Sequence, residues 1–222
     1  MTRRSKQKPK KKRKRLNTIQ IASIVLGTIL FLCAASFGGY LWYEGTQHQE
    51  ALRNYPVAYT DLIKQNAEKY ELDPYLVQSI IRCESSNDPK AVSKVGAIGL
   101  MQIMPDTGEW IAHKIDPELA YSLDMLTVPA TNIEYGCWYL KFLSDRFDGN
   151  VMEIVAAYNA GHGSVQNWLD DPRFSQNGTL TTIPFEDTAR YYDNVILAYE
   201  NYTTLYPDLF TTNTQSATVV AG

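Results

Sequence analysis

The chain has 222 residues, 45% hydrophobic and 20% charged, which suits one domain of ordinary size with an appendage and excludes a multi-domain assembly. Its formal net charge of −3 conceals a division: ten of the 21 basic residues lie between Arg3 and Arg15, and all 24 acidic residues lie beyond Leu16, so the chain after Leu16 carries a charge of −13. Three cysteines without paired C-x-x-C spacing exclude a disulfide-dense miniprotein and a cysteine-rich structural zinc site.

The N-terminal region predicts a membrane location. Residues 1–15 form a basic arm, and residues 16–43 contain no charged side chain, whereas a membrane span needs about 20 mostly apolar residues. Basic residues directly before a span favour a cytoplasmic arm. We therefore expect an uncleaved signal anchor at 16–43 that crosses the cytoplasmic membrane once, with everything after Glu44 on the extracytoplasmic side.

The N-terminal region has three alternative interpretations. A cleaved signal peptide would also explain the order of basic, apolar and small residues, but the apolar run exceeds the usual length of about 7–15 residues and ends in the interfacial pair Trp42 and Tyr43. A lipoprotein signal at Cys33 is disfavoured by the bulky residues before it. The arm could bind nucleic acid, but its place before the span favours the orienting role, so no nucleic-acid partner is expected.

The chain after the span is expected to be mainly α-helical. Residues 44–54 form a short polar stalk, residues 55–206 a single domain, and residues 207–222 a disordered tail rich in Thr, Ser and Ala. Apolar residues recur at helical spacing, and sustained alternation of apolar and polar residues is absent, which supports this fold class. The expected helices lie at 59–70, from Asp73-Pro74 onward, 133–147, 151–158 with a stop near Gly161, 164–169, and 188–205.

The motif content limits the chemistry to carboxylates. The sequence has no G-x-x-x-x-G-K-S/T phosphate loop, no H-E-x-x-H and no G-x-S-x-G. His48, His113 and His162 are scattered without ligand spacing, so no metal and no cofactor is implied.

One carboxylate is distinguished by its position. Glu84 follows Ile80 by four residues and Val77 by seven, which places it on the buried stripe near the C-terminal end of its helix. Burial and the negative helix end both raise a carboxyl pKa, so the group can act as a general acid. The alternatives are a structural Glu paired with Arg82 and a frayed helix end exposed to water.

Several motifs resemble a known family. Glu84-Ser85-Ser86-Asn87-Asp88-Pro89, Ala91-Val92-Ser93, the run from Gly96 to Pro105 (GAIGLMQIMP) and Ala157-Tyr158-Asn159-Ala160-Gly161 are similar, in this order, to the soluble lytic transglycosylase family with its lysozyme-like fold. The resemblance covers about Asp73 to Tyr192. Asn87 replaces the family's usual aromatic residue, and His162 replaces a frequent proline.

The resemblance implies an enzyme that cleaves the β-1,4 bond between N-acetylmuramic acid and N-acetylglucosamine in peptidoglycan glycan strands. Glu84 matches the catalytic acid. The matching substrate-site residues are Ser93, Gly99, Met101, Gln102, Met104, Tyr158, Asn159 and, where the family has a Glu before Thr, Asp187 with Glu186 beside it. Gly99, like Gly96, is expected in a tight loop close to the sugar. From their residue type alone, Met101 and Met104 are as readily core residues as residues of the cleft wall.

The motifs supply only one dependable acid, Glu84, whereas ordinary glycosidases need two carboxylates. A transglycosylase needs one, and its product is a 1,6-anhydro sugar. The rival functions are a muramidase of the same fold that uses water and a non-catalytic wall-binding scaffold in a cell-envelope complex. A last expectation is a disulfide between Cys83 and Cys137, the two cysteines of the outer domain.

Overall fold

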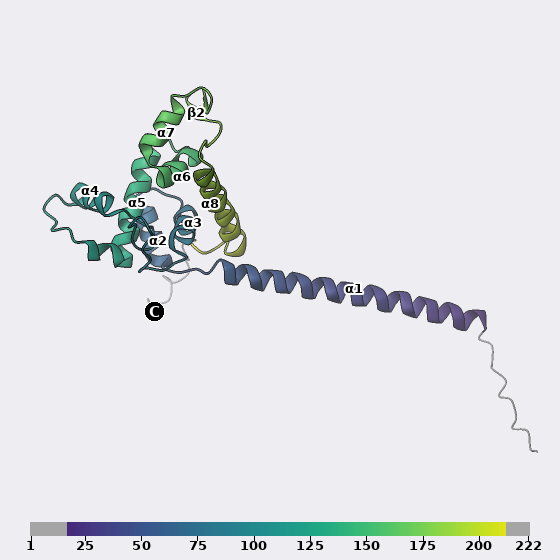
Figure 1. Cartoon of the computed structure of the whole chain (residues 1–222). Helices are drawn as coiled ribbons and strands as arrows, with labels where there is room; N and C mark the ends of the chain where they lie inside the picture. Colours follow the sequence, from purple (N-terminus) through teal and green to yellow (C-terminus); the bar gives the residue numbers. More distant parts are fainter. Residues whose placement is uncertain (1–16, 212–222) are drawn as a thin grey trace, which may run out of the picture. The chain divides into compact units, whose positions relative to one another are not determined.

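The computed structural model describes residues 17–211 (Figure 1). The chain divides into two compact units, residues 1–50 and 51–222. The predicted basic arm at 1–15 lies outside the described residues, as do residues 212–222 of the predicted tail. The start of that tail is described, and there the Phe210 ring packs edge-on against Tyr75 with ring centroids 5.0 Å apart.

The described part of the first unit consists almost entirely of helix α1 (Thr18–Asn54), which extends a few residues into the second unit and has no buried residue. Its N-terminus is capped reciprocally: the Asn17 side-chain oxygen accepts from the Gln20 N–H at 2.9 Å, and the Gln20 side-chain oxygen accepts from the Asn17 N–H at 3.1 Å. With a mean hydropathy of 2.2 in its most apolar window, the helix is long and apolar enough to cross a membrane, a property that a signal sequence shares. The predicted span and stalk form one continuous helix.

The second unit is mainly helical, as predicted. Its elements are α2 (Thr60–Lys69), α3 (Pro74–Ser85), α4 (Pro105–Ile115), the 3-10 helix η1 (Leu123–Thr127), α5 (Pro129–Arg146), α6 (Val151–Ala160), α7 (His162–Leu169), the strands β1 (Ser175–Gln176) and β2 (Thr179–Leu180), and α8 (Glu186–Leu205). Helix α4, η1 and the strand pair were not predicted.

Local capping explains where the predicted helices begin. The Asp73 carboxylate accepts the Tyr75 N–H at 2.8 Å, and Pro74 occupies the first helical position, so α3 starts as predicted. Asn150 caps α6 by accepting the Glu153 N–H, and α6 ends at Ala160 before Gly161. The six helices expected in this unit are therefore confirmed, with shifts of a few residues at their ends.

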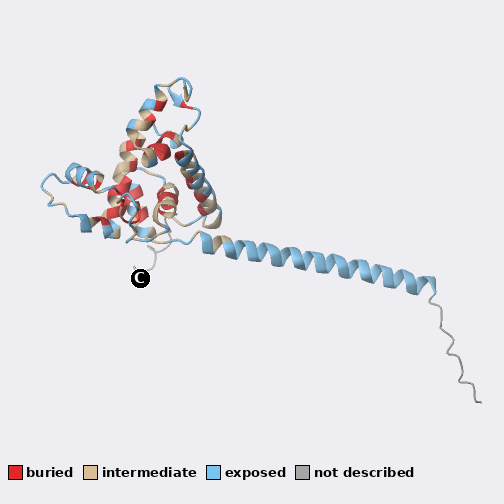
Figure 2. Ribbon diagram, viewed as in Figure 1, coloured by how far each residue is buried: buried red, intermediate tan, exposed pale blue. Residues whose placement is uncertain are grey.

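A single apolar core joins these helices (Figure 2). Helix α3 packs against α2 and α8, and α5 packs against α2, α4 and α6. The fully buried side chains include Ile63, Val77, Ile80, Leu100, Met101, Ile133, Leu140 and Val195. Because α3 lies between α2 and α8, its position is fixed from two sides, including the turn that carries Glu84.

The junction between α1 and α2 is fastened through its backbone to the rest of the second unit. The Asn54 carbonyl accepts from the Arg82 Nε at 2.9 Å, the Tyr55 carbonyl from the Tyr206 hydroxyl at 2.9 Å, and the Pro56 carbonyl from the Tyr202 hydroxyl at 3.1 Å. Three consecutive carbonyls are thus bound by side chains, so residues 54–56 belong structurally to the domain.

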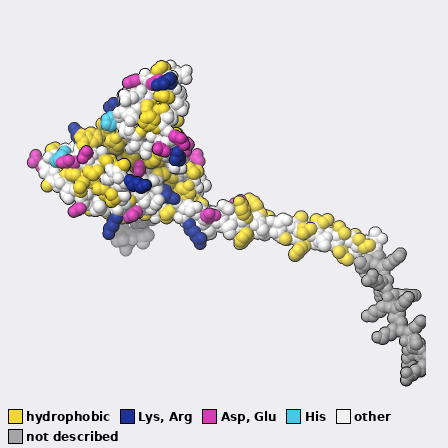
Figure 3. Space-filling view, in the orientation of Figure 1, with side chains coloured by type: hydrophobic (Ala, Val, Ile, Leu, Met, Phe, Trp, Pro, Cys, Tyr) yellow, Lys and Arg dark blue, Asp and Glu magenta, His cyan; other side chains and the backbone are white. Residues whose placement is uncertain are grey.

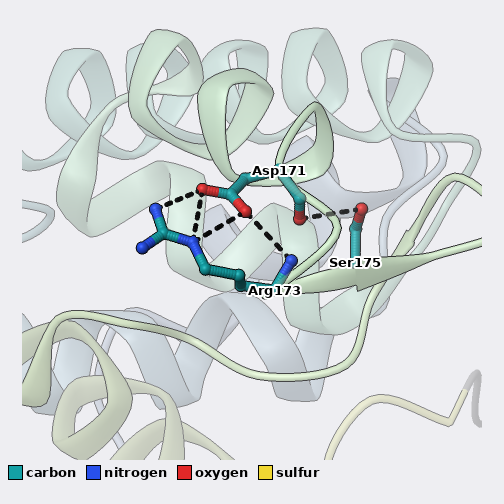
Figure 4. Close-up of polar contacts among 3 residues, drawn as sticks. All are labelled: Asp171, Arg173 and Ser175. Carbon is teal, nitrogen blue, oxygen red and sulfur yellow. Dashed lines mark hydrogen bonds and ion pairs between the residues drawn. The ribbon is translucent and has the colours of Figure 1, made fainter.

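The α7–β1 connection is a polar turn (Figure 4). Arg173 donates through Nε and Nη2 to the Asp171 carboxylate at 2.5–3.0 Å, and the Ser175 hydroxyl donates to the Asp171 carbonyl at 3.3 Å. The Arg173 side chain lowers the pKa of Asp171 to about 2. The β1–β2 hairpin that follows turns at Asn177 and Gly178, both with positive φ, as a two-residue turn of type I′ requires.

The predicted disulfide is wrong, because Cys83 and Cys137 are both free thiols. Cys83 lies on α3, which packs against α2 and α8, whereas Cys137 is buried on α5, which packs against α2, α4 and α6. The prediction assumed that α3 and α5 face each other directly. Burial raises the pKa of Cys83 to about 11 and that of Cys137 still further, so neither thiol ionises readily.

Candidate active site

The centre of the site is Glu84, in the last turn of α3. It shares its helix face with Val77 and Ile80, which are fully buried, and its own side chain is half-buried at the edge of a cavity of about 240 Å³. Loss of hydration raises the pKa of Glu84 to about 7. The carboxyl group is therefore poised to give up a proton and take one back near neutral pH.

A tyrosine that the sequence reasoning missed holds this carboxyl group. The Tyr191 hydroxyl donates to Glu84 Oε1 at 2.7 Å from α8, and this bond partly offsets the effect of burial on the Glu84 pKa. Burial and the adjacent carboxylate raise the pKa of Tyr191 well above its usual value, so the phenol keeps its proton. Its spacing from Thr188 and Val195, both buried on α8, is the signal that could have identified it.

The wall facing Glu84 is the loop from Ala91 to Met104. Two single β-bridges, Val92 with Ile98 and Ile98 with Ile103, fold it back on itself. Ser93, predicted as a substrate-site residue, lines the Glu84 cavity, and its hydroxyl accepts the Ala97 N–H at 3.0 Å. The hydroxyl thereby keeps its own proton for another acceptor.

Gly99 was expected close to the sugar, and the structure corrects this. Gly99 is buried, and a Cβ there would come within 2.3 Å of the Leu126 carbonyl and 2.4 Å of the Asn132 amide nitrogen. Its φ of +81° also favours glycine. Glycine is thus required for packing of the loop against η1 and α5, not for approach of a ligand.

Asn132, a second residue that the sequence reasoning missed, organises the loop from inside. This α5 residue is 1% exposed; its amide donates to the carbonyls of Leu126 at 2.8 Å and Ile98 at 3.0 Å, and its oxygen accepts the Met101 N–H at 2.7 Å. Asn132 precedes Gly136 by four residues and Leu140 by eight, and this polar residue on the buried stripe of α5 is the available signal; its partners 6 to 34 residues away are not visible in the sequence.

The Met101 side chain also departs from expectation. It is fully buried and packs against Gly136 on α5, so it does not line the cavity as the resemblance suggested. Its carbonyl is the part that serves the site, because it accepts the Tyr158 hydroxyl at 2.8 Å. Burial and the nearby Glu84 carboxylate raise the pKa of Tyr158 well above its usual value.

Four other predicted residues come together between two adjoining cavities. Gln102, Met104, Tyr158 and Asn159 line both the Glu84 cavity and a second one of about 260 Å³, which extends toward α4 and Gly161. The Gln102 amide donates to the carbonyls of Ala91 and Gly99 at 3.2 and 3.0 Å, which holds the residue at its unusual φ of +47°. Asn159 accepts from the Thr188 hydroxyl at 2.9 Å, and this bond joins α6 to α8. We call the two cavities together the cleft.

Asp187 does not reach the cleft. Its side chain is 93% exposed and that of Glu186 is 92% exposed, and both pair with Arg190 on the outer side of α8. The expectation that one of them belongs to the substrate site is corrected, because the first turn of α8 directs Thr188, not its acidic neighbours, inward. Of the residues lining the cleft, Glu84 is the one carboxylate in the described part of the chain.

Within residues 17–211, no group of three or more His, Cys, Asp and Glu side chains is arranged to hold a metal ion. The cleft instead offers one carboxyl group with a pKa near 7, a tyrosine that orients it, and amide and hydroxyl groups around a hollow. This arrangement can transfer a proton to a leaving group and recover one from a nucleophile.

Comparison with known proteins gives this arrangement a family context. Residues 61–179 match the family described as the transglycosylase SLT domain. The chain is 38% identical over 170 residues to the soluble lytic murein transglycosylase of Escherichia coli K12, covering 76% of this chain and 25% of that protein. It is 36% identical to the membrane-bound lytic murein transglycosylase E of Buchnera aphidicola, covering 61% of this chain and 65% of that one.

Solved structures agree with these sequence matches. The 70 kDa soluble lytic transglycosylase from Escherichia coli superposes with a TM-score of 0.64 at 34% identity, covering 77% of this chain and 27% of that chain. The present chain therefore spans about a quarter of the length of the soluble relatives that it matches.

Proposed function

Because the chain belongs to the transglycosylase SLT domain family, we propose that it is a peptidoglycan lytic transglycosylase that cleaves the β-1,4 bond between N-acetylmuramic acid and N-acetylglucosamine. The observation that carries the proposal is Glu84, a half-buried carboxyl group with a pKa near 7 at the edge of the cleft. A lytic transglycosylase needs one group that serves first as acid and then as base, and such a pKa suits both roles.

In the proposed reaction Glu84 donates its proton to the glycosidic oxygen as the bond between that oxygen and C1 of the muramic acid breaks. The N-acetylglucosamine leaves with the protonated glycosidic oxygen as its new hydroxyl group. The C6 hydroxyl of the same muramic acid then attacks C1, and the Glu84 carboxylate takes its proton. The product is a 1,6-anhydro sugar, no water is consumed, and Glu84 ends protonated as it began.

The surrounding residues receive supporting roles in this proposal. Tyr191 occupies Glu84 Oε1 and thereby leaves Oε2 to face the substrate. Ser93, Gln102, Met104, Tyr158 and Asn159 line the cleft and contact the sugars. Met101, Gly99 and Asn132 act indirectly, because they hold the loop and the Tyr158 hydroxyl in place.

Product analysis tests the reaction against its rival. The full chain in detergent is incubated with purified peptidoglycan, and the released muropeptides are analysed by mass spectrometry. Muramic acid ends lighter by one water than reducing ends support the proposal. Reducing ends alone would indicate a hydrolytic muramidase, and no release above a Glu84→Gln control would indicate a non-catalytic wall-binding protein.

We also propose that α1 is a retained anchor, with the basic arm in the cytoplasm and the catalytic domain at about 55–206 on the side of the cell wall. The absence of any buried residue in α1 and the existence of membrane-bound relatives support this location. The test is fractionation in high salt with analysis of the mature N-terminus. A retained anchor leaves an intact start near Met1 in the membrane fraction, whereas a start near Phe37 would mean cleavage.

A further inference from the structure

The turn that directly follows Glu84 has an unusual backbone. Helix α3 ends at Ser85, and the next two residues, Ser86 and Asn87, are both left-handed, with φ of +54° and +68°. Residues other than glycine adopt this conformation at a cost and persist in it only where their surroundings hold them. Arg82 holds the first of them, because its Nη1 donates to the Ser86 hydroxyl at 3.0 Å.

Asn87, the second left-handed residue, is held by a separate group of side chains. Gln78 of α3 donates through Nε2 to Asn87 Oδ1 at 3.2 Å, and the Asn87 amide donates to the Pro56 carbonyl at 3.5 Å. The Tyr202 hydroxyl donates to the same carbonyl at 3.1 Å. Burial raises the pKa of Tyr202 to about 12, although hydrogen bonds from Gln78 and Asn87 oppose the rise, so both amides lie beside its hydroxyl. We call Gln78, Asn87, Tyr202 and the Pro56 carbonyl the turn clasp.

Gln78 is an unfavourable residue for packing alone. It is fully buried, and in the part of the chain that the structure describes its Oε1 has no hydrogen-bond partner. An unpaired buried oxygen destabilises a folded protein, and an apolar side chain of similar size would avoid this loss. The residue therefore lowers stability while its Nε2 supplies the bond to Asn87.

The turn clasp also reaches the segment that leaves α1. Figure 3 shows charged side chains on α1 at the end that leads into the second unit, and Arg53 lies in its last turn. Pro56 follows two residues after the helix ends at Asn54. Asn87 stands where the family that the motifs resemble usually has an aromatic residue, so its bond with Gln78 is not a general feature of that family.

We propose that Asn87 is a positioning residue, which holds the turn after α3 so that the Glu84 carboxyl group stays at the Tyr191 hydroxyl and at the edge of the cleft. The proposal rests on the proposed function, in which Glu84 is the acid. Asn87 is not among the residues that line the cleft, so it acts through the backbone of the turn. Without the clasp the last turn of α3 relaxes, and the Glu84 side chain turns toward water.

Asn87→Gly tests the clasp, because it removes both side-chain bonds of Asn87 and leaves a residue that accepts the left-handed conformation. The full chain in detergent is assayed for muropeptide release from soluble glycan strands. We expect kcat to fall about tenfold and KM to stay within about twofold, since the cleft walls are unchanged. NMR titration of the Glu84 carboxyl carbon should give a lower pKa than in wild type, because burial is the main cause of its raised pKa and the displaced group regains water.

A second variant separates positioning from stability. Gln78→Leu removes the donor and the unpaired oxygen together, so its melting temperature should equal or exceed that of wild type while kcat still falls several-fold. The double variant with Asn87→Gly should be no slower than the slower single variant, because the two residues act as one unit. The matched control is Asn177→Gly, the same substitution at another left-handed residue, in the β1–β2 hairpin, and it should change neither kcat nor the Glu84 pKa.

Two results would overturn the positioning role: wild-type kcat and Glu84 pKa in folded Asn87→Gly, or wild-type kcat in folded Gln78→Leu. Failure of the proposed function would instead appear as wild-type protein that releases nothing from the glycan strands. The NMR titration needs no substrate, so it would still decide whether Asn87 positions Glu84.

Discussion

The two walls of the cleft are held by different forces. Glu84 stands on α3, whose apolar stripe is clamped in the core between α2 and α8, and its carboxyl group receives one hydrogen bond from the described residues, that of Tyr191. The loop opposite is held by directional bonds, above all the three that Asn132 makes to it and to η1. The helix that carries the reacting group thus depends mainly on non-directional packing, whereas the loop combines buried side chains such as Leu100 and Met101 with specific donors and acceptors.

The largest expected effect concerns the reacting group itself. Glu84→Gln removes both the acid and the base, so release of anhydro-muropeptides should fall at least about 10²–10⁴-fold. The amide is nearly isosteric, and the apolar packing that holds α3 should survive, which circular dichroism and a melting curve will check. Substantial activity in a folded Glu84→Gln protein would transfer the acid role to another group and remove the basis of the comparison.

The next effect is on the opposite wall. Asn132→Ala deletes three hydrogen bonds and leaves the Met101 N–H and the Leu126 and Ile98 carbonyls to compete for other partners, so the free energy of unfolding should fall by about 2–4 kcal/mol. Chemical denaturation measures it. A loss below about 0.5 kcal/mol would show that the loop holds its shape without these bonds, in which case the two walls are not differently supported.

A pH series sharpens the contrast between the walls. Folding raises the pKa of Glu84 from 4.5 to about 7, so the native protein holds a proton that the unfolded chain has released, and stability falls as pH rises from about 4.5 to 7. Gln cannot ionise. Glu84→Gln should therefore be more stable than wild type by roughly 3 kcal/mol at pH 8, and this gain should vanish near pH 4.

Asn132→Ala is the matched variant for this series, because Asn132 has no titratable group and its deficit should be the same at both pH values. A stability gain from Glu84→Gln that does not change with pH would contradict the burial of an ionisable group at this position.

The smallest effect is expected at the bond from Tyr191 to the carboxyl group, the one side-chain bond to Glu84 within residues 17–211. Tyr191→Phe removes a donor that favours the charged form of Glu84, so the pKa of Glu84 should rise. The alkaline limb of the pH–activity profile should then move to higher pH. Activity at pH 7 should fall only several-fold, since packing still places the carboxyl group. An unshifted profile would mean that the Tyr191 bond has no influence on the proton that reacts.

The two walls also differ in how much of their structure can be predicted from the sequence. Six helices of the second unit and the position of Glu84 follow from apolar spacing and from the Asp73-Pro74 start, because these signals are local in the sequence; α4 and η1 were not predicted. Residues expected from the family resemblance, such as Gln102, Tyr158 and Asn159, lie along the cleft. Their roles remain predictions until variants are measured.

What sequence reasoning could not supply depends on distant partners. Tyr191 meets Glu84 across 107 positions, and Asn132 meets Met101 across 31, so neither partnership leaves a local pattern. The same limitation explains the misplaced residues: the motif run contains Met101 without indicating that its side chain faces α5, and Asp187 is adjacent to Thr188 without sharing its direction. Local periodicity predicts faces of helices, and long-range bonds decide which faces meet.

The proton on Glu84 also governs how many molecules are ready to react. With a pKa of about 7, protonated and ionised molecules coexist near neutral pH, and the protonated share grows as the pH falls. In the proposed reaction the proton taken from the C6 hydroxyl replaces the one given to the leaving oxygen. A molecule that begins a turnover with Glu84 protonated thus ends it with Glu84 protonated, and successive cuts along a strand require no exchange of protons with the solvent.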